Sequence, residues 1–250
     1  MDFLASLDAP RWIVLIFSAA MVGLAKSGLE GGALIAIPFL AVSYGARASS
    51  GLLLGIMITA DLVAVWHYKN DADLGHLKRL LPWAMIGLLL GVIVGGAIPE
   101  RSFRTIMTSM ILFSAVIMIA RELYGKAWTF PEKWWAAAPL GLLAGFASMV
   151  GNAAGPVMGL YLLSSGLMKG NIVGTGVWFF FLVNLIKVPF HIFSWHTFTT
   201  GTLLADLVVV PVTILATVIG VRIVRLIPEK PYRLFLIVVA MVGGLYLGLR

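Results

Sequence analysis

The sequence contains no cysteine, few histidines and few charged residues. Without cysteine, a chain of 250 residues has no disulfide bonds, no thiol redox chemistry and no cysteine-ligated metal site. Four histidines, His67, His76, His191 and His196, are too few and too dispersed for a metal cluster. No Walker loop, HExxH motif or readable Ser-His-Asp set is present. We therefore expect no metal, no cofactor and no enzymatic activity.

Charged residues make up only 12% of the chain and hydrophobic residues 60%. Soluble domains average about 25% charged residues, so this composition indicates a membrane protein. The net charge of +7 would suggest nucleic-acid binding in a soluble protein. Here the basic residues lie in short loops between apolar runs, so we expect a lipid bilayer as partner and no nucleic acid. The acidic N-terminus lacks the positive region of a secretory signal, so we expect the first apolar segment to be retained.

Ten apolar runs, bounded by charged or turn-forming residues, divide the chain. They lie at about 11–26, 31–44, 50–66, 80–98, 105–121, 135–150, 154–166, 172–193, 203–221 and 234–249. A helix that crosses a membrane needs about 20 residues, with a range of about 17–25. Runs 80–98 and 172–193 have this length, whereas 31–44 and 154–166 are too short to cross unaided. Each short run is the second in a set of five.

This regularity indicates an internal duplication. At an offset of 129, the matching residues are Trp66 with Trp195, His67 with His196, Pro82 with Pro211, Gly91 with Gly220 and 98-IPE-100 with 227-IPE-229. At an offset of 123, they are Gly28 with Gly151, Gly32 with Gly155, Leu40 with Leu163 and Gly51 with Gly174. We therefore divide the chain into a first repeat, 1–128, and a second repeat, 129–250, within one integral membrane domain.

Each repeat holds five apolar segments, and an odd number places the second copy upside down in the bilayer, as in many secondary transporters. The predicted fold is an all-α membrane protein of two inverted-topology repeats. Each repeat is a short or re-entrant helical hairpin followed by three transmembrane helices. The sequence leaves open whether segments 11–26 with 31–44, and 135–150 with 154–166, span or re-enter.

The distribution of basic residues predicts the orientation, because cytoplasmic loops carry an excess of Lys and Arg. With the N-terminus outside, the inner loops take 12 of the 18 basic residues and the outer loops take 5, with Lys187 left inside a segment. If the first hairpin is re-entrant, only Lys26 no longer counts as an inner-loop residue, and the inner loops keep their excess of basic residues. We therefore expect both termini outside.

The tips of the two hairpins are the candidate binding site. In the re-entrant interpretation, 27-SGLEGG-32 and 151-GNAAG-155 meet near the midplane, and a short helix begins at each tip. Free backbone N–H groups and the positive dipole end make such a helix N-terminus suitable for an anion. The residues expected there are Ser27, Gly28, Gly31, Gly32, Gly151, Asn152 and Gly155. The alternative is helix packing, because GxxxG spacing also lets membrane helices approach closely, as at Gly87, Gly91 and Gly95.

Lys26 and Glu30 have two interpretations that the sequence leaves open. If the first segment crosses the membrane, both lie in water at its cytoplasmic end, where the pair contributes only a few tenths of a kcal/mol. If the hairpin is re-entrant, both approach the cavity. Lys26 would then attract anions, and Glu30 is a candidate for proton coupling.

Asp61 and Lys187 lie inside the third segment of each repeat. Ionisable groups within a membrane span are costly and are functional candidates by default. The two residues either form a structural ion pair or act in the site, Lys187 in anion binding and Asp61 in proton coupling. Asn184 and His191 can share a helical face with Lys187. His191 is a further candidate for proton coupling, although a lone histidine is more often a packed core residue.

Four other polar or aromatic residues are assigned to the membrane interface. Asp206 stands near the start of run 203–221 and is expected at the interface. Trp66 and Trp195, together with Tyr68, suit the aromatic belt better than a binding site.

The chain resembles the TauE/SafE family, the sulfite-exporter permeases. The resemblance rests on 28-GLEGGALIAIPFL-40, which is close to the family's G-x-G-G-G…P-x-L pattern, followed by Ala48 and Gly51. In the second repeat it rests on 145-GFASMVGNAAGPVMGLYLL-163 and 174-GTGVWFFFLVNLIKVPF-190. Two departures concern substrate choice: Glu30 replaces a usual glycine, and 151-GNAAGP-156 replaces a triple glycine.

The resemblance implies a permease of the bacterial cytoplasmic (inner) membrane that moves small sulfur-containing or organic anions by a proton-linked or potential-driven route. Combined with the tips, it leads to the hypothesis of alternating access with a central anion site. The rival classes are a cation or amino-acid carrier that uses Asp61 and Glu30, and a membrane-embedded enzyme or assembly factor. The exact substrate, the direction, the coupling ion and whether the protein forms a homo-oligomer stay open.

Overall fold

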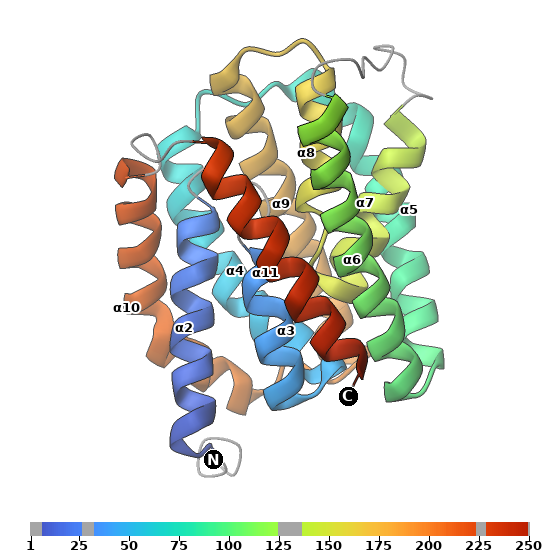
Figure 1. Cartoon of the computed structure of the whole chain (residues 1–250), viewed down its shortest axis with the longest axis vertical. Helices are drawn as coiled ribbons and strands as arrows, with labels where there is room; N and C mark the ends of the chain where they lie inside the picture. Colours follow the sequence, from blue (N-terminus) through green and yellow to red (C-terminus); the bar gives the residue numbers. More distant parts are fainter. Residues whose placement is uncertain (1–6, 27–32, 125–136, 224–228, 250) are drawn as a thin grey trace.

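A computed structural model describes residues 7–26, 33–124, 137–223 and 229–249 of the chain. It confirms the prediction of an all-α protein, because every regular element in these ranges is a helix (Figure 1). The helices are α2 (Ala9–Ala25), α3 (Ala33–Tyr44), α4 (Ala46–Tyr68), α5 (Leu74–Ala97), α6 (Glu100–Tyr124), α7 (Ala137–Gly151), α8 (Gly155–Ser164), α9 (Lys169–Phe193), α10 (Thr200–Ile223) and α11 (Glu229–Leu249). Each corresponds to one of the ten apolar runs.

Two of the helix pairs are hairpins that do not cross the molecule. In Figure 1, α2 rises from the lower end and α3 returns to that end, while α7 descends from the upper end and α8 returns upward. These four helices have only 10 to 17 residues. The six longer helices run between the two ends, and α2 begins at the end where α11 finishes.

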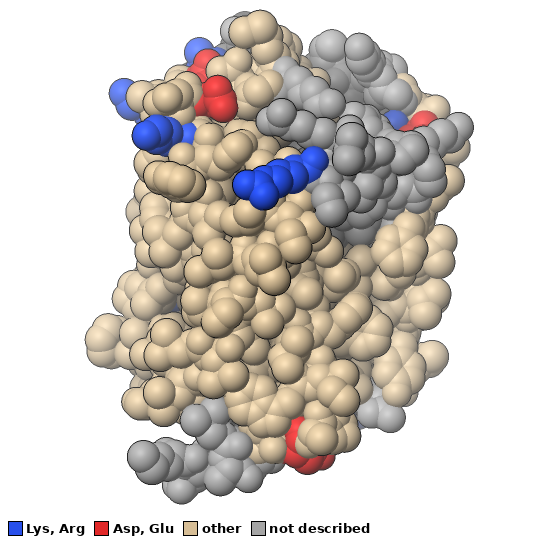
Figure 2. Space-filling view, turned by 90° about the vertical axis from the view of Figure 1, so that its left-hand side faces the viewer, with Lys and Arg blue, Asp and Glu red and all other residues tan. Residues whose placement is uncertain are grey.

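Five helices of the described chain, α4, α5, α6, α9 and α10, are long and apolar enough to cross a membrane. Large hydrophobic side chains are exposed on the outer faces of the bundle, including Ile93 of α5, Leu215 of α10 and Val242 of α11. Figure 2 shows a wide band across the middle of one face with almost no charged side chain, and Lys and Arg gathered near the upper end. Such a belt is the surface that lipid requires.

The helices pack in corresponding pairs. Helix α2 packs most extensively against α10, and α5 packs most extensively against α7. Likewise, the contact of α3 with α11 corresponds to that of α8 with α6 in the other half. The contact of α4 with α10 corresponds to that of α9 with α5. An exchange of the two halves would produce these pairs, which is the pattern the predicted inverted repeat requires.

Polar side chains mark the beginnings of three helices. The carboxylate of Asp8 accepts a hydrogen bond from the N–H of Arg11 at 3.1 Å, and that of Asp73 accepts one from His76 at 2.9 Å. Such N-caps satisfy backbone N–H groups that lack partners within the helix. Glu100, which is distant from α4 in the sequence, also caps that helix. Its carboxylate accepts hydrogen bonds from the N–H groups of Ala46 and Arg47 at 2.6 and 3.2 Å.

Glycines bring α5 and α7 into backbone contact. A Cβ at Gly87 would collide with the carbonyl of Leu142, and a Cβ at Gly145 would collide with the carbonyl of Ala84. The structure thus confirms the packing interpretation of the glycines on α5. Close approach of this kind is a main source of attraction between helices in lipid, where the hydrophobic effect is absent.

We expect Gly145→Ala to destabilise the protein by about 1–3 kcal/mol, because the added methyl group must push two helix backbones apart. The matched control is Gly170→Ala, since nothing lies within 4 Å of a Cβ at Gly170. Thermal unfolding in detergent measures both. Equal midpoints for the two variants would contradict the close contact.

Candidate functional site

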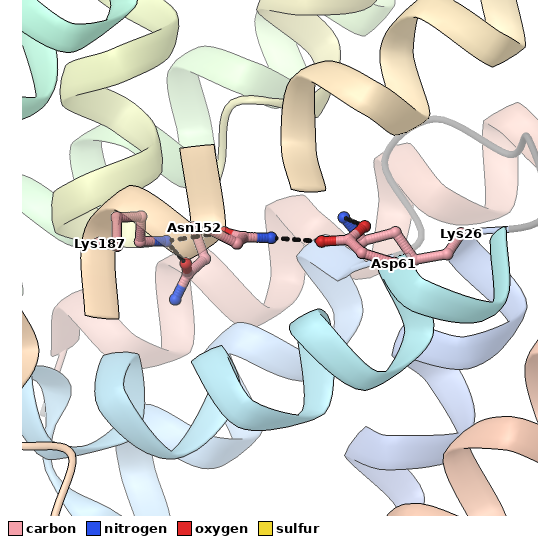
Figure 3. Close-up of polar contacts among 5 residues, drawn as sticks. Lys26, Asp61, Asn152 and Lys187 are labelled. Carbon is pink, nitrogen blue, oxygen red and sulfur yellow. Dashed lines mark hydrogen bonds and ion pairs between the residues drawn. The ribbon is translucent and has the colours of Figure 1, made fainter. Parts of the chain in front are cut away.

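A row of polar side chains crosses the centre of the helix bundle, where α4 packs against α9 (Figure 3). Lys187 of α9 is 0% exposed, and its Nζ donates hydrogen bonds to Oδ1 of Asn152 and, at 3.3 Å, to Oδ1 of Asn184. Both acceptors are neutral amide oxygens. Within the described ranges no carboxylate forms an ion pair with Lys187, and its buried amino group is hydrogen-bonded by neutral amides.

At the other end of the row, Lys26 pairs with Asp61. Lys26 Nζ lies 2.7 Å from Asp61 Oδ1, with exposed side-chain fractions of 10% and 0%. The same ammonium group lies 4.7 Å from the ring centroid of Phe180, a cation–π contact that adds to its stabilisation. Lys26 directly follows α2, so the end of the first hairpin helix lies beside the middle of α4.

Asn184 joins the two ends of the row. Its Nδ2 donates to Asp61 Oδ2 at 2.7 Å, while its Oδ1 accepts from Lys187. The proposed alternative of a direct Asp61–Lys187 ion pair is therefore wrong, because an amide separates the two charges. Among the described residues the cluster contains two lysines and one aspartate, so basic side chains outnumber acidic ones there.

The second hairpin tip supplies Asn152. This residue has a positive φ of 51°, a left-handed conformation that asparagine tolerates better than most residues. Because Lys187 occupies Oδ1, only the amide N–H₂ of Asn152 can serve another partner; its Nδ2 lies 3.4 Å from the carbonyl oxygen of Ser50. Helix α8 begins just beyond at Gly155, with no side-chain cap at Ala154 and a proline in its first turn.

The described flanks of both tips line one cavity of about 90 Å³. Its wall contains Lys26 and Ala33 from the first hairpin and Ser148, Asn152 and Gly155 from the second. One water needs roughly 10–15 Å³ of such volume, so the cavity has room for a solute of several heavy atoms. Its lining continues toward the upper ends of α8 and α9.

The position of Lys26 favours one of its two interpretations. Its side chain faces the cavity and is almost buried, rather than lying in water at the end of a crossing helix. Lys187 is not among the residues that line the cavity. Asn152 and Asn184 line the cavity, and Lys187 lies directly behind them.

The other candidates are partly separated from this cluster. His191 is 0% exposed, and its Nδ1 lies 2.7 Å from Thr197 Oγ1, away from the row. The predicted tip residues Ser27, Gly28, Glu30, Gly31 and Gly32 lie outside the described residues. Gly151 makes only ordinary contacts, so close helix packing does not explain the glycine there.

Two interfacial assignments are wrong. Trp66 is 77% exposed, as an aromatic-belt residue should be, but Trp195 is 7% exposed and donates from Nε1 to the carbonyl of Val92 at 3.1 Å. Asp206 is 4% exposed and lies two turns inside α10. The hydroxyls of Thr199 and Thr202 bond the backbone where α10 begins, so the helix starts before the apolar run.

Sequence reasoning missed Phe180 and Ser148 as lining residues. An aromatic or serine in an apolar run carries no signal that distinguishes a cavity wall from a packed or lipid-facing surface. In the part of the chain that the structure describes, no three His, Asp or Glu side chains gather as metal ligands would.

A family model described as sulfite exporter TauE/SafE matches residues 15–247. The chain belongs to the TauE/SafE family. Because this is a family of membrane transporters, the protein is an integral membrane permease, as its apolar helices require. No curated protein and no solved structure matches the chain. The polar row and the cavity lie within the matched residues, and so does each TauE/SafE motif identified in the sequence.

Proposed function

We propose that this TauE/SafE protein is a secondary transporter of small anions, specifically sulfur-containing oxyanions or organosulfonates. The observation that carries the proposal is the excess of positive charge at the buried cavity. Among the described residues, two lysines, Lys26 and Lys187, lie near one carboxylate, Asp61, which Lys26 and Asn184 already engage. A negative solute would balance the remaining charge.

The bound anion would meet three kinds of donor. The N–H groups in the first turn of α8 are not capped by a side chain, and a helix N-terminus favours anions. The amide of Asn152 would add a hydrogen bond, since Lys187 holds its oxygen. Lys26, on the opposite wall, would supply charge directly. Residues 27–32 complete the site in this proposal, as the sequence predicts.

Alternating access would move this site between the two faces of the bacterial inner membrane. If the N-terminus is outside, the upper end of Figure 1 is cytoplasmic, in agreement with the basic side chains there in Figure 2. The cavity lining extends from Lys26 to Leu162 and Ile172, near the upper ends of α8 and α9. We assign this structure to the conformation that faces the cytoplasm.

A ligand panel tests the anion proposal. Sulfite, sulfate, thiosulfate, sulfoacetate and simple carboxylates are added to purified protein, and thermal unfolding is followed. At about 100 times its Kd, a ligand that binds only the folded state stabilises it by about 2.7 kcal/mol. We expect one of the sulfur-containing anions to raise the unfolding midpoint and to be taken up into proteoliposomes.

The same panel separates the rival functions. Stabilisation by Na⁺, K⁺ or amino acids, with no effect of any oxyanion, would favour a cation or amino-acid carrier. Both oxygens of Asp61 are already engaged, which weighs against that function. Chemical turnover in detergent without a gradient would indicate a membrane-embedded enzyme.

A further inference from the structure

Asp206 is a buried carboxylate outside the polar row. Residue 206 lies in α10, is 4% exposed, and neither of its side-chain oxygens has a hydrogen-bond partner in the described structure. Its Oδ2 lies against the backbone of Gly55 on α4, in the space that a Cβ at that position would occupy. Gly55 therefore makes the room into which this carboxyl group packs.

No charged side chain in the described part of the chain pairs with Asp206. Helix α10 packs against α2 and α4. The ionisable groups on these helices and at their caps are Asp8, Arg11 and Lys26 of α2, and Arg47, Asp61, His67, Tyr68 and Lys69 of α4. Lys26 pairs with Asp61, Arg47 donates to the carbonyl of Ile98, and none of these groups forms an ion pair with Asp206.

An ionised carboxylate in these surroundings would be strongly destabilising. The effective penalty for a buried, unpaired ion is several kcal/mol, and no described polar group bonds either oxygen of Asp206 to offset it. A protonated carboxyl group is neutral and avoids this penalty. The packing at Gly55 thus suits the acid form of Asp206, and the ionised form needs water.

The location of Asp206 connects it to transport. Gly55 precedes Asp61 by six residues on α4, which is about 9 Å toward the lower end of the bundle. The cavity extends from the polar row in the other direction, so the α4–α10 contact closes the path below the site. Gly51, one turn earlier on α4, is packed against the carbonyl of Thr197 in the same closure.

We infer that Asp206 is a proton-binding residue that couples proton movement to opening of the α4–α10 contact. This inference rests on the proposed anion transport and names its coupling ion. While α10 is packed against α4, the carboxyl group holds its proton. When the two helices separate toward the lower face, water reaches Asp206, and the proton leaves its oxygen for that water. As the site turns back to the upper face, a proton from the cavity side restores the neutral acid and allows the contact to close, so each cycle carries one proton across the membrane.

The experiment compares wild type with Asp206→Asn in proteoliposomes that contain a pH-sensitive dye. We expect wild type to move protons when the transported anion is added and to accumulate that anion in response to a pH gradient. Asp206→Asn should lose both responses, while counterflow exchange of the anion continues at a measurable rate. The matched control is Asp8→Asn, which neutralises an exposed carboxylate while keeping a good N-cap residue. It should behave like wild type.

A second measurement does not depend on transport. The infrared spectrum of wild type at neutral pH should contain the carbonyl band of a protonated carboxylic acid, and Asp206→Asn should lack it. If Asp206→Asn does not fold, Asp206→Leu, which suits an apolar contact, replaces it in both experiments. Absence of this band in wild type overturns the inference.

The outcomes separate the two proposals. If wild type transports no anion, the proposed function fails and the infrared band alone decides whether Asp206 carries a proton. If wild type transports an anion while Asp206→Asn keeps gradient-driven accumulation, or if a Na⁺ gradient drives uptake in place of protons, the inference about Asp206 is wrong.

Discussion

Replacing Lys187 by methionine is expected to abolish anion uptake. Methionine keeps most of the length of the side chain but removes the charge that lies behind Asn152 and Asn184. Without the ammonium group, the excess positive charge at the cavity disappears, and the amide of Asn152 is free to turn its oxygen toward the solute. Loss of a buried, hydrogen-bonded charge at a binding site costs about 2–5 kcal/mol. We therefore expect affinity to fall by at least about 30-fold.

The measurement is uptake into proteoliposomes together with anion-induced thermal stabilisation. Lys78→Met is the matched control, because Lys78 is an exposed lysine on α5 and the change in charge is identical. A folded Lys187→Met protein with undiminished flux would remove Lys187 from the site. A protein that melts without anion at the wild-type temperature shows that the loss is not one of folding.

The second large effect is expected from mutation of the Lys26–Asp61 pair. Stability and transport should respond differently to the single and double variants. Lys26→Met leaves Asp61 as an uncompensated charge that is 0% exposed, and breaking a buried pair in this way costs about 3–5 kcal/mol. In the double variant Lys26→Met/Asp61→Asn both charges are gone. Replacement of a whole buried pair is often neutral, so most of the lost stability should return.

Transport should not return with it. The double variant lacks the lysine that lines the cavity, so the anion loses a direct charge partner even though the fold is restored. Unfolding of the wild type, both single variants and the double variant in detergent gives the coupling energy between the two residues, and uptake is measured on the same four proteins. Full transport by the double variant would show that the pair is only structural.

Asp61 and Lys187 could be selected from the sequence because an ionisable residue inside an apolar run is conspicuous wherever the run lies. Asn152 and Asn184 were also named from the sequence, but their pairing with Lys187 and Asp61 could not be predicted. Asn184 reaches Asp61 across 123 residues, and Asn152 reaches Lys187 across 35. Such contacts depend on how α4, α9 and the second hairpin tip are packed, and no local pattern reports this.

Asp206 shows how a helix boundary changes an assignment. The apolar run begins at 203, which placed the carboxylate near an interface. Helix α10 begins at Thr200 and packs against α4, so the same residue is buried. Trp66 and Trp195 make the same point from matching positions in the two halves, since one is exposed and the other packs between Phe103 and His191.

The amino-acid sequence alone determined the helical class, the membrane environment, the ten segments and the family. These depend on run length, hydrophobicity and motif, which are properties of neighbouring residues because each helix satisfies its own backbone hydrogen bonds. Tertiary structure decided that the described parts of both hairpins return to the end they entered from, and that Lys26 rather than Lys187 pairs with Asp61. It also decided that neither side-chain oxygen of Asp206 has a hydrogen-bond partner among the described residues. Burial and charge pairing are set by which helices come into contact, and in this protein those helices are distant along the chain.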